Sequence, residues 1–382
     1  MKIGIEAQRI FRPDKHGMDF VILEVLRRLR ERNDGHEYVV FVAPGEDPCL
    51  EENERMQIIE VSCPTYPLWE QWALPRAVRQ SGVDMLHCTS NTAPLHCSVP
   101  LLLTLHDVIY LQQHKKPQGM SRYQQLGWHY RRWNVPHIVG HCRHIITVSA
   151  TEQSNIVHCF PHIKDRISVV HNGVSPCYGQ MPTTEIRTVT RKYLPDETYL
   201  LCLGNTDPRK NTEGVLTAYY HYLKHSPRKL KLILTGLSQT YVENLVATLG
   251  ISECLPYLIC PGYIPGPDLP ALYNGAFCFL FPSLLEGFGI PVLEAMACGT
   301  PVITSDCSSL PEVAGKGGLL INPFLPSEIT DLLIQLEKDS ALYQRQKVYG
   351  LRHASLFSWD RTAENYLQIY NQMGETNPYH SL

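Results

Sequence analysis

The sequence of 382 residues has none of the short motifs that most often indicate a bound cofactor or metal ion. No GxGxxG follows an early strand, which argues against NAD or FAD, and no GxxxxGK is followed by Ser or Thr, which argues against a P-loop NTPase. Despite 17 histidines and 13 cysteines, there is no HExxH, no CxxC and no Cys/His cluster at metal-ligand spacing. No two aspartates are separated by one residue, which removes a simple device for holding a metal on a diphosphate. We therefore expect neither a resident cofactor nor a bound metal.

Long apolar runs and paired cysteines are also missing. No stretch approaches the ~18 apolar residues that cross a bilayer, and residues 1–6 predict a strand rather than the apolar part of a signal peptide. The cysteines are odd in number and scattered, and Cys202 and Cys278 stand in apolar runs where a thiol acts as a small hydrophobe. Free buried thiols fit a reducing compartment. We predict a cytoplasmic protein, either free or peripheral to the inner face of the cell membrane.

Acidic residues are missing from one stretch of the chain. Overall, 34 Lys plus Arg stand against 37 Asp plus Glu, and this net charge of -3 argues against a nucleic-acid partner. Residues 108–151, however, contain no Asp or Glu but six basic residues: Lys115, Lys116, Arg122, Arg131, Arg132 and Arg143. Aromatic residues, among them Trp128 and Trp133, are interleaved with these cations. Residues 112–133 therefore form either a surface for a lipid-linked or anionic acceptor at a membrane, with peripheral membrane contact, or a solvated helical face whose aromatics pack inward.

What the sequence does contain is a regular alternation of short apolar runs and longer amphipathic segments, which is typical of βαβ units on a parallel sheet. An apolar fraction of 44% fits a globular chain, and the length favours two domains of roughly 100–200 residues each. In the first half we expect strands at residues 2–5, 38–42, 57–61, 85–87, 101–105 and 144–148. Residues 20–30 predict a helix whose inward face has apolar residues at helical spacing: Ile22, Val25, Leu26 and Leu29.

The same alternation restarts in the second half. We expect strands at residues 199–203, 230–235, 257–260, 276–281, 301–304 and 318–321, with helices at 212–222 and 241–249. Residues 175–198 are polar and contain proline, which predicts an interdomain linker. The pattern therefore predicts two Rossmann-like, doubly wound α/β domains that face a cleft, over residues 1–180 and 195–358. Ligands in such sheets bind at the carboxyl ends of the strands. Residues 359–373 predict a final amphipathic helix.

The most informative segment is residues 281–301, FPSLLEGFGIPVLEAMACGTP. A strand ends where it begins, a glycine-containing loop follows, Pro291 suits the first turn of a helix and Gly299 suits its end. Glycines let backbone N–H groups approach a ligand closely, and a helix N-terminus attracts an anion such as phosphate. Glu286 in the loop and Glu294 in the first helical turn could then meet different parts of one ligand. The alternative is two solvated glutamates near the positive end of a helix.

As a whole, this segment closely resembles the signature of retaining glycosyltransferase family 4, whose members have the GT-B fold and move a sugar from a nucleotide donor. The resemblance implies that Glu286 holds the hydroxyls of the donor sugar and that Glu294 holds the ribose. It also implies donor contacts along the intervening loop, from Gly287, Phe288, Gly289 and Ile290. Because the terminal helix of this family crosses back, residues 359–382 are assigned to the first domain by resemblance.

Two further segments of the second half follow in the family's order. Residues 204–211, GNTDPRKN, resemble the family's GxxxPRKN loop after the first strand of the second domain. Arg209 offers a bidentate fork and Lys210 a point charge, which suits a diphosphate without a metal. The alternative, two exposed cations at a helix start, opposes the helix dipole. The resemblance implies that both residues neutralise the leaving diphosphate. The turn PGYIP resembles the family's base-binding turn, which implies backbone contacts from Tyr263 and Ile264.

In the first half, His106 and Asp107 follow an apolar strand and resemble the family's His-Asp at that place. A lone histidine is more often structural, but the carboxyl end of a strand favours a functional role. The resemblance implies that His106 contacts the donor sugar near the reacting carbon, and that Asp107 supports it. The family also has a glycine loop near the N-terminus that approaches the donor phosphate or the acceptor, and Gly17 matches it. The three residues after Gly17 depart from the family's usual Ile-Gly-Arg-Tyr pattern.

These resemblances extend over nearly the whole chain and imply a retaining, metal-independent hexosyltransferase of glycan, polysaccharide or glycolipid biosynthesis. Its catalytic residues would be His106, Glu286, Arg209 and Lys210. The implied partners are a nucleotide-sugar donor, with GDP-mannose ahead of UDP-linked glucose or N-acetylglucosamine, and a glycan or lipid-linked acceptor. The alternatives are a sugar-nucleotide-binding protein without turnover and another GT-B enzyme, such as a synthase that accepts a sugar phosphate. No oligomeric state follows from the sequence.

Overall fold

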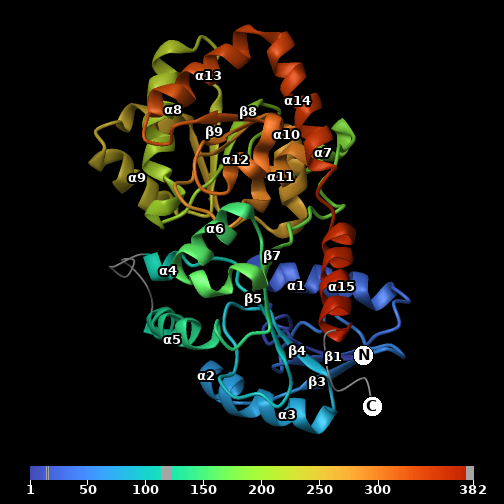
Figure 1. The fold of residues 1–382 in the computed structure, drawn as a ribbon. Coiled ribbons are helices and arrows are strands. Elements are labelled where there is room, and N and C mark those ends of the chain that lie inside the picture. Colours follow the sequence, from blue (N-terminus) through green and yellow to red (C-terminus); the bar gives the residue numbers. More distant parts are fainter. Residues whose placement is uncertain (14, 16, 113–121, 376–382) are drawn as a thin grey trace. The chain divides into compact units, whose positions relative to one another are not determined.

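The fold is that of a computed structural model, which describes residues 1–382 except 14, 16, 113–121 and 376–382 (Figure 1). The chain divides into two compact units. Unit 1 comprises Met1–Gly173 and Trp359–Leu382, and unit 2 comprises Val174–Ser358. Each unit is built on one parallel sheet covered by helices, so the predicted pair of doubly wound α/β domains is confirmed. Unit 1 ends earlier than residue 180, where the sequence placed the end of the first domain.

Unit 1 has a seven-stranded parallel sheet in the order β3-β2-β1-β4-β5-β6-β7. Its strands are β1 Lys2–Glu6, β2 Glu37–Val42, β3 Met56–Glu60, β4 Met85–Cys88, β5 Leu101–Thr104, β6 His144–Thr147 and β7 Ile167–Val169. The six predicted strands form within one residue of their expected ends, whereas the three-residue β7 was missed. Because β1 pairs with both β2 and β4, the strand order reverses between β1 and β4. Such a switch point is where ligands bind in open α/β sheets.

The helices of unit 1 include the predicted amphipathic one near the N-terminus. They are α1 Gly17–Glu31, α2 Tyr66–Leu68, the π-helix η1 Trp69–Ala73, α3 Leu74–Ser81, α4 Ile109–Gln112, α5 Arg122–Ile138, α6 Ala150–Cys159, the 3-10 helix η2 Pro161–Arg166 and α15 Trp359–Glu375. The four apolar residues expected on the inward face of α1 are all buried. Among the described residues, no helix is both long and apolar enough to cross a membrane.

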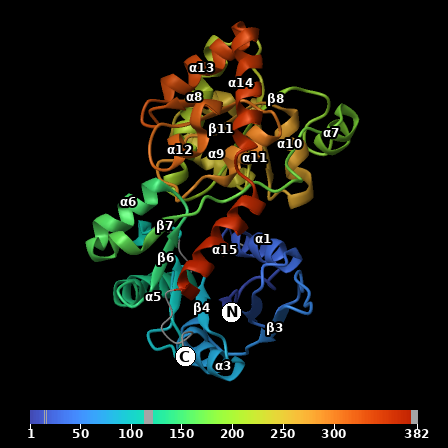
Figure 2. The ribbon, with the colours of Figure 1, turned by 45° about the vertical axis from the view of Figure 1, so that its right-hand side comes forward.

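The C-terminal helix α15 belongs to unit 1 and packs along α1 (Figures 1 and 2). The hydroxyl of Tyr370 on this helix lies 2.8 Å from His87 Nδ1, and His87 Nε2 lies 2.7 Å from the hydroxyl of Thr104. Burial lowers the pKa of His87 to about 3, so its ring is neutral, donating one of these bonds and accepting the other. The helix therefore returns to the first unit, as the resemblance implied.

Unit 2 has a six-stranded parallel sheet in the order β10-β9-β8-β11-β12-β13. Its strands are β8 Tyr199–Leu203, β9 Lys231–Thr235, β10 Leu258–Gly262, β11 Ala276–Phe281, β12 Val302–Ser305 and β13 Gly318–Ile321, each within two residues of its predicted range. Here β8 pairs with both β9 and β11, so the switch point of unit 2 lies between β8 and β11.

Helices cover both faces of this sheet. They are α7 Thr183–Thr190, η3 Pro208–Lys210, α8 Thr212–His225, α9 Gln239–Thr248, η4 Ser252–Tyr257, η5 Gly266–Asp268, α10 Leu269–Gly275, α11 Ile290–Ala297, α12 Leu310–Ala314, η6 Gly315–Gly317, α13 Pro326–Lys338 and α14 Ser340–Ala354. Successive β11 side chains point to opposite faces, as a strand requires. Cys278 joins the core under α8 and α13, whereas the ring of Phe279 lies 5.1 Å from that of Tyr273 on α10.

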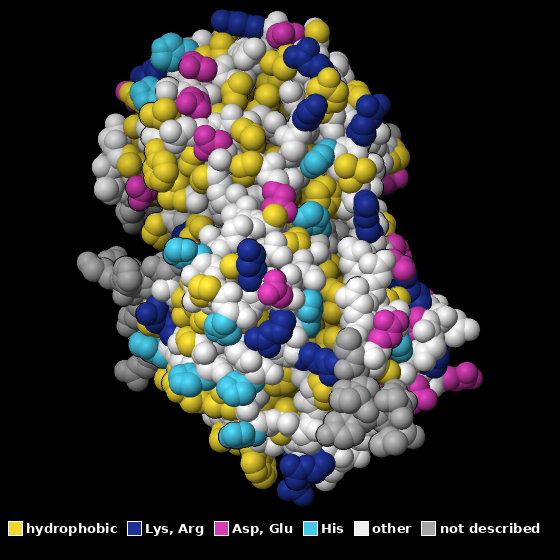
Figure 3. All heavy atoms as spheres, in the orientation of Figure 1, with side chains coloured by type: hydrophobic (Ala, Val, Ile, Leu, Met, Phe, Trp, Pro, Cys, Tyr) yellow, Lys and Arg dark blue, Asp and Glu magenta, His cyan; other side chains and the backbone are white. Residues whose placement is uncertain are grey.

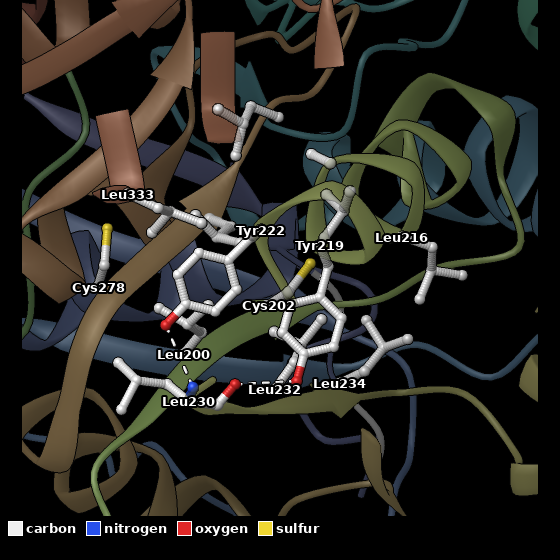
Figure 4. Close-up of a cluster of buried hydrophobic side chains, with 14 of the residues drawn as sticks. Leu200, Cys202, Leu216, Tyr219, Tyr222, Leu230, Leu232, Leu234, Cys278 and Leu333 are labelled. Atoms are coloured by element: carbon white, nitrogen blue, oxygen red, sulfur yellow. Dashed lines mark hydrogen bonds between the residues drawn. The ribbon is translucent and has the colours of Figure 1, made fainter. Parts of the chain in front are cut away.

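The core beneath α8 also satisfies its buried polar groups (Figure 4). The Tyr219 hydroxyl donates to the carbonyl of Leu230 at 2.9 Å, and the Leu230 N–H donates to the Tyr222 hydroxyl at 3.1 Å. Cys202 is buried in the same cluster as a free thiol, which confirms its expected behaviour as a small hydrophobe. This packed layer fixes β8 and β11, whose carboxyl ends lead into the site described below.

The prediction that residues 175–198 form an interdomain linker is wrong in one respect, because this segment contains the helix α7. This helix packs against α10 within unit 2, with Ile186 and Thr190 lying close to Gly275. An added Cβ at Gly275 would lie 2.6 Å from the Tyr199 hydroxyl, so a larger side chain would disturb this packing. The segment has too few apolar residues to show a helical period, which is why the pattern indicated a linker.

Candidate active site

Two loops meet at the switch point of unit 2. One follows β8 over residues 204–211, and the other follows β11 and leads into α11. The N–H of Leu284 donates to the carbonyl of Arg209 at 2.7 Å, and Arg209 Nη1 donates to the carbonyl of Leu285 at 3.2 Å. Asn211 Nδ2 adds a bond of 3.1 Å to the carbonyl of Pro282. The two motifs that the sequence singled out are therefore tied into one surface.

The charged side chains of this surface are paired with one another. Lys210 Nζ lies 2.6 Å from Glu286 Oε1 and 5.4 Å from the centre of the Phe281 ring. Arg209 Nε lies 2.9 Å from Asp207 Oδ2, and the Arg209 Nη2 group makes no bond within the described residues. Each cation thus keeps donors for a further oxygen, since Lys has three N–H bonds and Arg has five. The structure brings together three of the predicted catalytic residues.

Two serines that the sequence reasoning missed hold the loop around Glu286. Ser308 Oγ accepts the N–H of Glu286 at 2.9 Å and lies 2.7 Å from its carbonyl oxygen. Ser309 Oγ donates to the carbonyl of Phe288 at 2.8 Å. Both serines follow β12, and Ser308 lies 22 residues after Glu286 along the chain. A Ser-Ser pair after a strand carries no local sign of this role, so only the fold reveals it.

Helix α11 begins directly after Gly289, whose φ of +112° lies in the region that favours glycine. An added Cβ there would lie 2.8 Å from a methyl carbon of Leu310. No side chain caps this helix N-terminus, and Pro291 occupies its first turn as predicted. The uncapped end leaves a place where an anion is favoured. At the other end, Gly299 has a φ of +76° and terminates α11, as expected.

Glu294 lies in a different environment from Glu286. It is the fifth residue of α11 and so stands in the second turn, which corrects its expected place in the first turn. Its Oε2 accepts a bond of 3.1 Å from the Tyr273 hydroxyl. Burial raises the pKa of Glu294 to about 7, although the hydrogen bonds from Tyr273 and Tyr178 oppose this shift. Near neutral pH this carboxyl group can therefore both donate and accept.

The turn after β10 presents the residues predicted near a base. Gly262 has a φ of +74° and accepts a 2.7 Å bond from the N–H of Gly236, which joins this turn to the loop after β9. Tyr263 is 83% exposed, whereas Ile264 is buried. The Tyr263 ring therefore contributes little to the fold, and its backbone is held by the turn itself.

In unit 1, His106 is buried at the carboxyl end of β5. Its Nε2 lies 3.0 Å from the carbonyl of Thr89, which can only accept, so Nε2 carries the proton. Burial lowers the pKa of His106 to about 4, and the ring is neutral at physiological pH. The His106 N–H donates to Asn91 Oδ1 at 2.6 Å. Asp107 accepts from the N–H of Ile109 at 3.2 Å, so it supports the start of α4.

Gly17 is the first residue of α1 and is exposed. An added Cβ would meet no atom within 4 Å, so packing within the described residues does not require a glycine here. Open space at a helix start agrees with close approach of a ligand.

In the stretch without acidic residues, some aromatic side chains are exposed and others pack inward, so each of the two alternatives from the sequence holds in part. Residues 113–121 and the side chains of 122–124 lie outside the described residues. Trp128 packs inward on α5 with the Arg132 guanidinium 4.6 Å from its ring centre, as the core reading predicts. Leu126 and Trp133 are exposed on the same helix, as the contact reading predicts. Among the described residues, no group of three His, Cys, Asp or Glu side chains is arranged to hold a metal.

Two doubly wound units with polar loops at their switch points define a two-domain α/β protein of the GT-B type. Residues 16–177 match the model of Glycosyltransferase Family 4, and residues 184–353 match that of Glycosyl transferases group 1. O-antigen chain mannosyltransferase B of Escherichia coli is 31% identical over 318 residues, which cover 82% of this chain and 80% of that protein. The chain therefore belongs to the family 4, group 1 glycosyltransferases.

Other relatives agree with this assignment. The serotype-specific mannosyltransferase WbdA of Escherichia coli is 30% identical over 244 residues, which cover 61% of this chain but only 30% of that longer protein. Sucrose-phosphate synthase from Thermosynechococcus elongatus superposes with a TM-score of 0.74 at 19% identity, covering 98% of this chain and 100% of that one. Anabaena HepE in complex with UDP-glucose gives 0.72 at 18% identity, covering 97% and 100%. These structural likenesses confirm the predicted fold.

Proposed function

We propose that this glycosyltransferase is a retaining hexosyltransferase that moves mannose from GDP-mannose to an acceptor hydroxyl of a glycan, polysaccharide or glycolipid. Glucose or N-acetylglucosamine on UDP are the next candidate donors. The mannosyltransferase names of the relatives at about 30% identity support the choice of mannose. The observation that carries the proposal is the joined pair of loops at the switch point of unit 2, where Arg209, Lys210 and Glu286 converge.

In this proposal the leaving diphosphate is stabilised by side chains and backbone groups, without a metal. Lys210 can keep its bond to Glu286 and still donate to a phosphate oxygen, and Arg209 Nη2 is free to do the same. The uncapped start of α11 adds a favourable dipole. Negative charge grows on the diphosphate in the transition state, so each lost contact costs about 2.7–4 kcal/mol of activation free energy, by analogy with an oxyanion donor.

The sugar and ribose contacts fall to the two glutamates. Glu286, fixed by Ser308 and Lys210, would accept from the sugar hydroxyls. Glu294 would bind the ribose, exchanging its bond to Tyr273 for one to the ligand. The neutral ring and backbone of His106 would contact the sugar near the reacting carbon.

The chemical step proposed is departure and attack on the same face of the sugar. The anomeric C–O bond to the diphosphate breaks, the acceptor oxygen bonds to the same carbon, and the acceptor proton passes to a phosphate oxygen of the leaving group. This route retains the configuration and needs no enzymic nucleophile. The neutral His106 does not compete with the phosphate as a base, because burial has lowered its pKa to about 4.

Slow hydrolysis of the donor by the purified protein tests this proposal. We expect GDP-mannose to be hydrolysed faster than UDP-glucose, UDP-N-acetylglucosamine or UDP-galactose, with no loss of rate in EDTA. Faster hydrolysis of a UDP-sugar than of GDP-mannose would show that the UDP-sugar is the donor. Loss of activity in EDTA would contradict a metal-independent step. Hydrolysis of no sugar nucleotide, together with thermal stabilisation by NAD, would contradict the function.

We also propose that unit 1 contacts an anionic membrane surface through α5 and η1. Four large apolar side chains are exposed on these two helices and on α2, namely Leu68, Trp72, Leu126 and Trp133. Gln71 on η1 donates to the Tyr130 hydroxyl on α5 at 2.7 Å, which joins the two helices. Figure 3 shows Lys, Arg and His side chains among hydrophobic ones over this part of the unit. Such a surface suits the headgroup region of a bilayer.

Flotation with vesicles decides this second proposal. Binding to anionic vesicles at low salt, weakened by Trp72→Ser with Trp133→Ser, is the expected result. Absence of binding to anionic vesicles under the same conditions would contradict it.

A further inference from the structure

The switch point of unit 1 holds two buried polar atoms without partners. They are Gln8 Oε1 and Arg9 Nη2, on consecutive residues of the turn that follows β1. Neither atom has a hydrogen bond within the described residues, and Gln8 is only 6% exposed. Leaving a buried donor or acceptor unmet costs about 1–3 kcal/mol, and folded proteins satisfy nearly all such groups. Two adjacent exceptions at a switch point indicate that a ligand supplies the missing bonds.

Arg9 is held so that one edge of its guanidinium remains available. Its Nε lies 2.9 Å from Oδ1 of Asp19, a side chain that is 2% exposed in the first turn of α1. This ion pair fixes the plane of the guanidinium, because the fork of Arg is rigid. Asp19 therefore positions the Nη2 group but does not accept a hydrogen bond from it.

Gln8 is fixed by a buried carboxylate. Glu6 at the end of β1 accepts the N–H of Gln8 at 3.0 Å with one oxygen and the N–H of Thr89 at 3.0 Å with the other. This bridge joins the loops after β1 and β4, the two strands that flank the switch point. The backbone that carries Gln8 and Arg9 is therefore fixed by hydrogen bonds to Glu6.

The cluster lies beside the histidine that the proposed mechanism uses. Burial lowers the pKa of His106, and the nearby charge of Arg9 contributes to the lowering. The carbonyl that receives the His106 ring proton belongs to Thr89, the residue bonded to Glu6. A group bound at Gln8 and Arg9 would therefore be close to the reacting sugar.

The chemistry of the two atoms limits the ligand. Gln8 Oε1 needs a donor, which a phosphate or carboxylate oxygen cannot provide, whereas Arg9 Nη2 needs an acceptor. Hydroxyl groups provide both. The formal charges of Arg9, Asp19 and Glu6 sum to one negative charge, which disfavours an anion at this place. A neutral sugar with neighbouring hydroxyls satisfies both atoms.

We propose that Gln8 Oε1 and Arg9 Nη2 bind hydroxyl groups of a neutral sugar in the acceptor, with Asp19 positioning Arg9. This inference rests on the proposed transferase function and specifies the part of the acceptor that unit 1 recognises. It assigns acceptor selectivity to Gln8 and Arg9, which precede the glycine that the family resemblance matched in this unit.

The test measures transfer and donor hydrolysis side by side. The variants are Arg9→Lys, which keeps a cation for Asp19 but loses Nη2, and Gln8→Leu, which removes the unmet oxygen at similar size. The probes are neutral methyl glycosides of mannose, glucose, galactose and N-acetylglucosamine, with mannose 6-phosphate as the anionic comparison. In both variants we expect the KM for the best neutral glycoside to rise at least about tenfold, and the ratio of transfer to hydrolysis to fall accordingly.

Arg30→Lys is the matched control, because Arg30 in the last turn of α1 also has a buried Nε without a partner. It should leave transfer and hydrolysis at wild-type rates. Gln8→Leu should also raise the melting temperature of unit 1, since it replaces an unmet buried oxygen by carbon. This second readout shows that the variant is folded.

The outcomes separate the inference from the function on which it rests. Hydrolysis of no sugar nucleotide by the wild-type protein would overturn both. Normal hydrolysis with an unchanged transfer ratio in Arg9→Lys and Gln8→Leu would overturn the inference alone. So would use of mannose 6-phosphate in place of every neutral glycoside.

Discussion

The two sheets have the same strand order around their switch points, yet the polar groups there are arranged in opposite ways. In unit 2 the charged side chains belong to two joined loops and are paired with one another, as in the buried Glu286 with the partly exposed Lys210. In unit 1 the groups are buried, and Gln8 and Arg9 retain unmet atoms. We infer from this difference that unit 2 suits a charged ligand that exchanges ion-pair partners, as proposed above. The unmet atoms of unit 1 suit the hydroxyl groups that we propose for its ligand.

The largest effect expected is on turnover, from Arg209→Ala at the switch point of unit 2. Loss of its contact with the leaving diphosphate should lower kcat about 10²–10³-fold. Arg191→Ala is the matched control, because Arg191 also pairs through Nε with an aspartate of unit 2 but is exposed and lies outside both loops of the site. Initial rates of GDP-mannose hydrolysis measure both variants. Equal rates in Arg209→Ala and wild type would contradict the proposal that Arg209 in unit 2 stabilises a charged ligand.

The next effect separates the two units by stability. Glu6→Gln replaces a buried carboxylate that accepts two backbone N–H bonds, so it should lower the free energy of unfolding of unit 1 by about 1–3 kcal/mol. Glu286→Gln removes the charge from a mostly buried ion pair in unit 2 but keeps an oxygen that accepts from Lys210 Nζ, so it should lower stability by only about 1 kcal/mol.

Urea unfolding followed by tryptophan fluorescence checks the first of these values, since all five tryptophans belong to unit 1. Far-ultraviolet circular dichroism, which reports both units, checks the second. If Glu286→Gln lowers the free energy of unfolding more than Glu6→Gln does, then the carboxylate that matters more for stability lies in unit 2, contrary to this account.

Comparison of pattern and fold explains why the two sites were not equally predictable. The residues of unit 2 lie in two continuous segments, so their spacing was visible, and the strands that carry them were predicted within two residues. The site of unit 1 is assembled from the ends of β1, β4 and β5 and from α1, so Glu6 and Thr89 meet across 83 positions. No local pattern reports such a meeting. Ser308 was missed for the same reason.

Helices and strands whose apolar residues form a clear pattern were predicted well, and those without such a pattern were not. The strand candidates succeeded because apolar runs on parallel strands are continuous. By contrast, β7 is three residues long and α7 has few apolar residues, so neither shows a period. The sequence left two alternatives for the basic stretch, an exposed contact surface or aromatics that pack inward. The structure shows some of each, because Trp128 turns inward while Trp133 is exposed.

An effect on the pH dependence of stability, seen only when the pH is varied, concerns the carboxyl group of Glu70 in η1. Burial raises the pKa of Glu70 to about 7, although the hydroxyls of Thr92, Tyr130 and Tyr66 donate to it and oppose the shift. A raised pKa means that the folded state binds more protons. The contribution of Glu70 to the stability of unit 1 should therefore be greatest below about pH 4.5, and about 3 kcal/mol of it should be lost as the pH rises from there through about 7.

Glu70→Gln should remove this dependence, so that the difference between wild type and variant changes from pH 5 to pH 8. Glu294 has a pKa raised to the same value by burial but lies in unit 2. Glu294→Gln should therefore leave the tryptophan-detected unfolding curve unchanged, which makes it the control. Parallel pH profiles of wild type and Glu70→Gln would show that Glu70 does not titrate in this range.

The smallest effect expected is from Tyr263→Ala. The proposed contact with the base comes from the backbone of this turn, and the ring is almost fully exposed. The KM for the donor should therefore change less than about threefold, and stability should not change. Fluorescence or calorimetric titration with GDP measures the binding. A loss of tenfold or more would assign the contact to the ring, since stacking of a base on an aromatic side chain is worth about 1–3 kcal/mol.

The most direct test of the division between the two switch points measures donor hydrolysis and transfer to a neutral glycoside in two variants. Lys210→Ala should lower both rates by the same factor, because it acts on the leaving diphosphate that both reactions share. Arg9→Lys should lower transfer at least about tenfold more than hydrolysis, because it acts on the acceptor alone. Equal losses in both rates from Arg9→Lys, or a selective loss of transfer from Lys210→Ala, would contradict the account.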